Sequence, residues 1–111
     1  MQSNPYTSVI FAAATADETA GVRDMSSFDN IVTYITCVGT ISTGTVTIEE
    51  AADVGSATWS TIGSAYDLTA LTGGGTTAIH LTNSAYKAIR WRLSDAVTGT
   101  GGSCTVTVVA H

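Results

Sequence analysis

The sequence predicts an all-β protein, a single antiparallel β-sandwich or jelly-roll-like domain of seven or eight strands. Composition is the first reason: the 111 residues include 10 Val, 8 Ile and 20 Thr, whereas Leu, Met, Gln, Glu, Lys and Arg together number 14. The β-branched residues suit a pleated sheet, and the second group holds the good helix formers other than Ala. The second reason is spacing, because short apolar stretches alternate with turns rich in Gly, Ser, Thr and Asn. An all-helical bundle is therefore excluded.

The expected elements follow from alternation and turn signals along the chain. Strands are expected at residues 8–15, 28–38, 43–51, 58–62, 76–82, 85–94 and 103–110. The charged segment 16–27 shows no alternation and is expected to be a connection or a short helical turn. Residues 65–71 fit either a strand or a helical turn, and residues 95–102 fit a hairpin connection. Because neither face of 28–38 is clearly polar, that strand could be buried on both sides.

The chain is expected to be one domain with a short N-terminal arm. Residues 1–7 form the arm, since they carry no cation and Pro5 limits strand pairing, and residues 8–111 form the sandwich. The apolar run 9–14 is too short to span a membrane and has no basic leader.

Large apolar side chains on the expected strands should supply most of the stability, with the two tryptophans as the costliest truncations. This expected core comprises Trp59, Trp91, Tyr34, Ile31, Ile35, Ile48, Ile89 and Val106. Cys37 and Cys104 have no metal-ligand spacing and are expected to be buried, reduced thiols, with a single disulfide as the alternative.

The charge content restricts the classes of partner. Charged residues make up 12% of the chain and the net charge is −5, so the basic patch needed for nucleic acid or an anionic membrane is missing. An ordinary monomer stays soluble through its surface charges. The low charge content therefore indicates that part of this surface is covered by a partner.

No set of residues predicts catalysis, a cofactor or a metal. Glu49 and Glu50 are adjacent on an expected strand and point to opposite faces, so with Asp53 they are expected to be solvated charges. His80 lacks a partner at ligand or triad spacing, and the glycines at 73–75 lack the Lys of a phosphate-binding loop. We therefore expect that the protein is not an enzyme.

Arg90 and Arg92 share one face of the strand at 85–94 with Tyr86, and two interpretations stay open. The pair could dock an acidic partner surface, or it could pair with an acidic residue on the neighbouring strand. The tyrosines and a tryptophan could instead form an aromatic platform for sugar binding.

Four segments, in this order, resemble the head decoration (cement) proteins of tailed bacteriophages. They are GTVTIEE at 44–50, ATWSTI at 57–62, AIRWRLS at 88–94 and GGSCTVTVV at 101–109. The resemblance implies a non-enzymatic virion protein, made in the host cytoplasm, that binds the capsid exterior through the major capsid protein, often as a homotrimer. In such a role, the expected partner contacts are Gln2, Ser3, Asn4, Pro5 and Tyr6 of the arm together with Arg90 and Arg92. The alternative function is a carbohydrate-binding or fibre-tip module that mediates attachment to the host surface.

Overall fold

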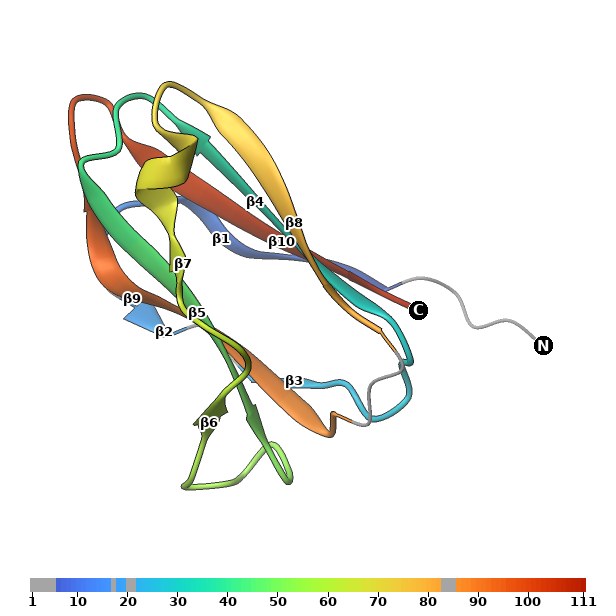
Figure 1. Cartoon of the computed structure of the whole chain (residues 1–111). Coiled ribbons are helices and arrows are strands. Elements are labelled where there is room, and N and C mark those ends of the chain that lie inside the picture. The colour runs from blue at the N-terminus through green and yellow to red at the C-terminus, as the bar shows by residue number, and fades with distance from the viewer. Residues whose placement is uncertain (1–5, 17, 20–21, 83–85) are drawn as a thin grey trace.

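The computed structural model describes residues 6–16, 18–19, 22–82 and 86–111, which form two antiparallel sheets packed as a β-sandwich (Figure 1). The four-stranded sheet has the order β1 (Tyr6–Ala14), β10 (Ser103–Ala110), β4 (Ile31–Val38) and β8 (Gly75–Leu81). The six-stranded sheet is built on β9 (Ala88–Thr98) and β5 (Thr43–Ala51). Its other strands have two residues each: β2 (Glu18–Thr19), β3 (Arg23–Asp24), β6 (Ser60–Thr61) and β7 (Tyr66–Asp67). The predicted β-sandwich is confirmed, and the comparison with a jelly roll stays a prediction.

The short strands are the main difference from the sequence expectation. The segment 16–27, expected to be a connection, contributes β2 and β3, which both pair with β9. Residues 65–71 contain both alternatives, since β7 runs directly into the 3₁₀ helix η1 (Leu68–Leu71). β9 continues to Thr98, four residues into the expected hairpin connection. Short segments can pair with a long strand such as β9 through backbone hydrogen bonds alone. The alternation of side chains in the sequence does not reveal such pairing.

The expected boundary between arm and domain lies inside a strand. Tyr6 and Thr7 pair with Ala110 and Val109 of β10, so they belong to the sandwich and not to an arm. The Tyr6 ring also packs on Phe28, with ring centroids 5.8 Å apart. The other predicted arm contacts, Gln2, Ser3, Asn4 and Pro5, lie outside the described residues.

The core lies between the two sheets and is centred on Trp91, whose side chain has no exposed area. Its Nε1 donates a hydrogen bond of 3.0 Å to Oγ1 of Thr33, which is also fully buried on the opposite sheet. Two predicted core residues are wrong: Tyr34 is 40% exposed, and Trp59 is only partly buried, outside the core cluster. Every second residue of β4 is buried and the residues between them are partly or fully exposed, so the strand is buried on one face and not on both.

Two fully buried residues come from outside the predicted strands. Met25 follows β3 and Leu68 begins η1, and both have no exposed area. Elements that lack alternation therefore still close the two ends of the core. Among the described residues, no helix is long and apolar enough to cross a membrane.

Cys37 and Cys104 are both free and buried, as predicted, and they lie opposite each other on β4 and β10. Burial raises the pKa of the Cys104 thiol from 9.0 to about 11, with Cys37 and Glu18 adding to the shift. Burial also raises the pKa of Cys37. Both groups therefore stay protonated and unreactive in the folded protein at neutral pH.

This burial predicts alkaline instability. From pH 9 to about 11 the unfolded chain loses the Cys104 proton while the folded chain keeps it, so the free energy of unfolding should fall with rising pH. Below pH 9 the Cys104 thiol is protonated in both the folded and the unfolded state, so it adds no pH dependence to the free energy of unfolding. Urea unfolding across this range, compared between wild type and Cys104→Ala, measures the effect, because the two proteins differ only in this thiol. Equal pH slopes in the two proteins, or fast thiol labelling of the native state, would contradict burial.

Candidate functional site

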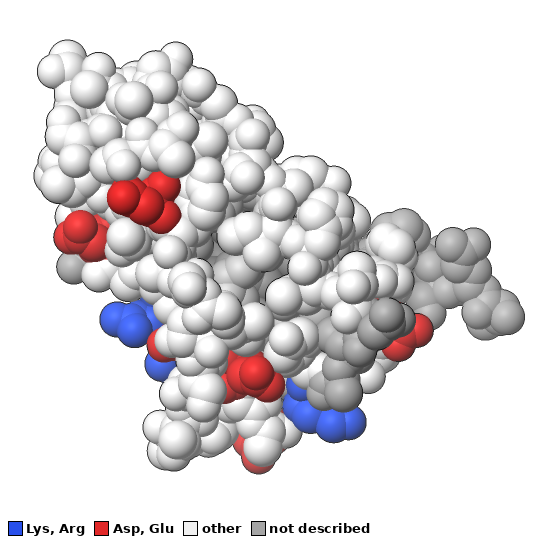
Figure 2. Space-filling view, viewed as in Figure 1, with Lys and Arg blue, Asp and Glu red and all other residues white. Residues whose placement is uncertain are grey.

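Charge is divided unequally between the two sheets. All 4 Lys and Arg and all 9 Asp and Glu of the sequence lie outside the four strands β1, β4, β8 and β10. Figure 2 shows the same division from one side, where the surface over β8 and over the loops at the top of the view carries no charged atoms. The four-stranded sheet therefore presents an outer surface to which its strands contribute no Lys, Arg, Asp or Glu.

We call this surface the uncharged face. It consists of the outward side chains of the four-stranded sheet: Thr7, Val9, Val32, Tyr34, Thr36, Val38, Thr76, Ala78, His80, Thr105, Thr107 and Val109. Strand register places Val9, Thr107, Tyr34 and Ala78 in one row across all four strands.

Apolar side chains and hydroxyl groups are mixed on the uncharged face. Val9, Tyr34 and Val38 are 55%, 40% and 54% exposed, and they are three of the four large apolar side chains that the structure describes as exposed. The Oγ1 atoms of Thr36 and Thr76 are hydrogen-bonded at 2.9 Å. Such a surface can be covered by a partner without the cost of burying a charge. The sequence alternation of β4 and β10 placed these residues on one face, but it did not show that this face is left uncovered.

The outer side of the six-stranded sheet carries an ion-pair cluster. Arg90 Nε lies 2.7 Å from Glu49 Oε1, and Arg92 Nη1 lies 3.3 Å from Glu49 Oε2. The Arg90 guanidinium also lies 4.5 Å from the centroid of the Trp59 ring, whose Nε1 donates to the Ser56 carbonyl at 3.0 Å. Both arginines therefore pair with an acidic residue on the neighbouring strand, which was one of the two interpretations.

Glu49 corrects an expectation, because its residue is 6% exposed and not solvated. The register of β5 against β9 places Glu49 opposite Arg90 and Thr47 opposite Arg92, so all four point to the same outer surface. The two arginine side chains, 26% and 39% exposed, then cover the carboxylate. Glu49 neutralises one of the two arginine charges, so the cluster keeps one excess positive charge. It therefore attracts an acidic partner less strongly than two unpaired arginines would.

The three acidic residues grouped in the sequence are separated in the structure. Glu50 pairs with Ile89 in the register and faces away from Glu49, as strand alternation predicted. Asp53 lies in the turn after β5, where Oδ1 accepts a 2.8 Å hydrogen bond from the Gly55 amide.

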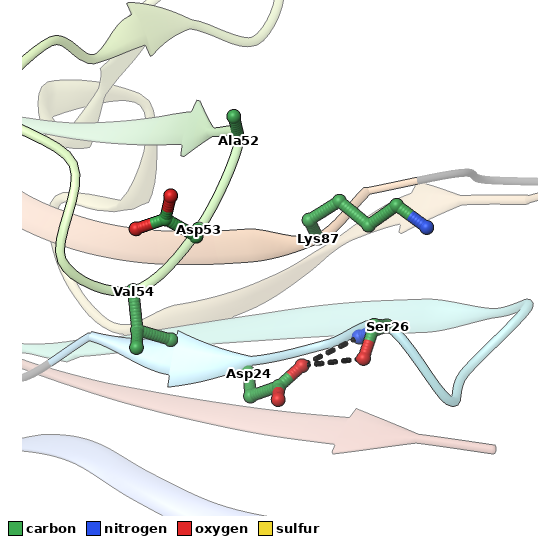
Figure 3. Close-up of a pocket in the computed structure, with 6 residues that line it drawn as sticks. All are labelled: Asp24, Ser26, Ala52, Asp53, Val54 and Lys87. Carbon is green, nitrogen blue, oxygen red and sulfur yellow. Dashed lines mark hydrogen bonds between the residues drawn. The ribbon is translucent and has the colours of Figure 1, made fainter.

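Asp53 also lines a shallow hollow of about 200 Å³ together with Asp24, Ser26 and Lys87 (Figure 3). Asp24 Oδ1 accepts hydrogen bonds from the Ser26 hydroxyl and amide, at 2.7 and 3.0 Å, and these bonds, with Lys87, hold the pKa of Asp24 below its usual value. The Lys87 side chain extends away from Asp53. Ligand pockets usually measure about 300–1,000 Å³, and both carboxylates already stabilise turns, so this hollow suggests no ligand chemistry.

Within the described ranges, no group of three or more His, Cys, Asp and Glu side chains is placed to hold a metal. The aromatic side chains considered for sugar binding do not share a surface, since Tyr34 lies on the uncharged face and Trp59 lies with the arginines on the other sheet. The uncharged face is thus a feature that internal contacts leave unexplained.

No family model and no curated protein matches the sequence. Among solved structures, the chain is similar to the crystal structure of the PBSX exported protein XepA, with a TM-score of 0.55 and 15% identity over 95% of this chain. The chain spans 36% of the length of that protein. At this identity the likeness shows a shared fold.

Proposed function

We propose that the chain is a non-enzymatic structural protein of a bacteriophage particle, which binds the outer surface of the capsid and reinforces contacts between shell subunits. The observation that carries the proposal is the uncharged face, because the core of a stable protein interface is depleted in charged residues. Exposed Val9, Tyr34 and Val38 provide apolar area to bury, and the threonine hydroxyls around them provide hydrogen-bonding groups.

The phage setting is supported by two independent observations. The structural neighbour is an exported protein of the phage PBSX. The order of segments over residues 43–110 resembles capsid decoration proteins. We therefore take a phage structural protein as the general assignment and capsid reinforcement as its specific form.

The proposed contact surface differs from the one expected from the sequence. Arg90 and Arg92 are already bound by Glu49, and Tyr6 is a residue of β1. An acidic partner would have to compete with Glu49 for both guanidinium groups. The uncharged face has no such competing contact and is the better candidate for attachment to the shell.

Charge placed on the uncharged face should therefore weaken attachment. Val9→Glu and Val38→Glu are expected to lower capsid affinity at least about tenfold, since a buried, unpaired carboxylate costs more than about 1.4 kcal/mol. Val54→Glu is the matched control, because Val54 is 54% exposed, like Val38, but lies in the turn after β5. Co-sedimentation of each purified variant with particles that lack this protein measures the affinity.

Heating the same particles with and without bound protein tests reinforcement. Particles that carry the wild type should release their DNA at a higher temperature than bare particles. Equal resistance would refute the reinforcing role, and equal binding of all three variants would refute attachment through the uncharged face.

A further inference from the structure

The edges of the two sheets are protected from pairing with other chains to very different degrees. An edge strand exposes unpaired N–H and C=O groups, and proteins protect it by shortness, charge, proline or bulges. On the six-stranded sheet, the peripheral strands β2, β3, β6 and β7 have two residues each, and three of them contain a charged residue. On the four-stranded sheet, β1 has two register shifts, at Val9/Phe11 and at Phe11/Ala14, and Ala13 has a φ of 48°.

β8 has none of these protections in the described part of the chain. It has seven residues, GTTAIHL, with no Pro, Lys, Arg, Asp or Glu. Its register with β4 is uninterrupted from Gly75 opposite Cys37 to Leu81 opposite Ile31. β8 ends the strand order of its sheet, and Figure 1 shows it along the side of the molecule with no strand beyond it. It is therefore a regular, uncharged strand with one side open to pairing.

We propose that β8 pairs antiparallel with β8 of a second copy, so that one sheet continues through both molecules. A two-fold axis at Ala78, the middle residue of the strand, uses its whole length and places Thr76 opposite His80 and Thr77 opposite Ile79. Ile79 and Leu81 are partly buried against the core, and pairing covers them further.

The distribution of charge allows a second copy to be the occupant. Each molecule carries a net charge of −5, so two copies repel each other unless their charged surfaces stay apart. All of these charges lie outside β8 and the strands of its sheet. Pairing through β8 brings the charge-free sides together and joins the two uncharged faces into one surface. This contact yields a dimer, in contrast to the homotrimer expected from the sequence.

The oligomeric state of the intact chain tests the pairing. Light scattering should give a mass twice 11.3 kDa for the wild type. Ala78→Lys should reduce the mass to that of a monomer, because it sets two like charges directly opposite each other. Ala57→Lys, at an exposed alanine in the turn before β6, should leave the dimer intact. Circular dichroism should show the same strand content in all three proteins.

A cysteine variant gives a second, independent measurement. Ala78→Cys places two thiols at the two-fold axis and should form a covalent dimer on mild oxidation, whereas Ala57→Cys should not; the native thiols are buried in both. A monomeric wild type, a trimer, or a dimer unaffected by Ala78→Lys would overturn the proposal. The proposal does not depend on the capsid assignment, because Val9→Glu and Val38→Glu test attachment separately.

Discussion

Replacing Trp91 with alanine is expected to lower the free energy of unfolding by about 3–5 kcal/mol, the usual cost of a large-to-small change of an aromatic residue in a core. Trp91 is fully buried, and it also links the two sheets through its hydrogen bond to Thr33. A loss of this size is a large fraction of the stability of an ordinary domain, typically about 5–15 kcal/mol. Urea unfolding followed by far-ultraviolet circular dichroism measures it.

Two further variants separate the packing of Trp91 from its hydrogen bond. Thr33→Val keeps the shape of the side chain but leaves Trp91 Nε1 without its acceptor, which should cost about 1–3 kcal/mol. Trp59→Ala removes a partly buried ring that contacts Arg90, and should cost about 1 kcal/mol. The sequence predicted that the two tryptophans would be the two costliest truncations. Equal losses for Trp59→Ala and Trp91→Ala would contradict the structure.

The sequence predicted the long strands well because alternation is a local property. β5 and β10 occupy the predicted residues 43–51 and 103–110 without change, and the buried set of β4 is one of its two predicted faces. Each of these strands has one face against the core, so its side-chain pattern carries the information that fixes its position.

Features that depend on distant partners could not be read in this way. β2 and β3 exist because β9 offers backbone groups to them, and Met25 is buried because this pairing turns it inward. The sequence placed Arg90 and Arg92 on one face, but their partner Glu49 is 41 residues away from Arg90 and its identity depends on the register of β5 with β9. The sequence predicted only that some part of the surface would be poor in charge. It could not locate the uncharged face, because tertiary pairing decides which strands share a sheet.

The second large effect is expected at Glu49. Glu49→Ala leaves Arg90 and Arg92 close together without the carboxylate between them. Removing one member of a buried ion pair costs about 3–5 kcal/mol. Because both arginines are partly exposed, water screens part of their repulsion, so we expect a loss of about 2–3 kcal/mol in the free energy of unfolding.

Glu50→Ala is the matched control, on the same strand and with the opposite orientation, and should cost less than about 1 kcal/mol. Glu49→Gln keeps the shape and one acceptor oxygen but loses the charge, so its loss should lie between those of the two alanine variants. A double-mutant cycle of Glu49→Gln with Arg90→Met then measures the pair alone, with an expected coupling of about 1–2 kcal/mol. The fluorescence of Trp59, which lies under Arg90, should change in Glu49→Ala and stay constant in Glu50→Ala. If Glu49→Ala costs no more than Glu50→Ala, the arginines are held by packing on Trp59 and the strand stems, and the carboxylate contributes no net stability.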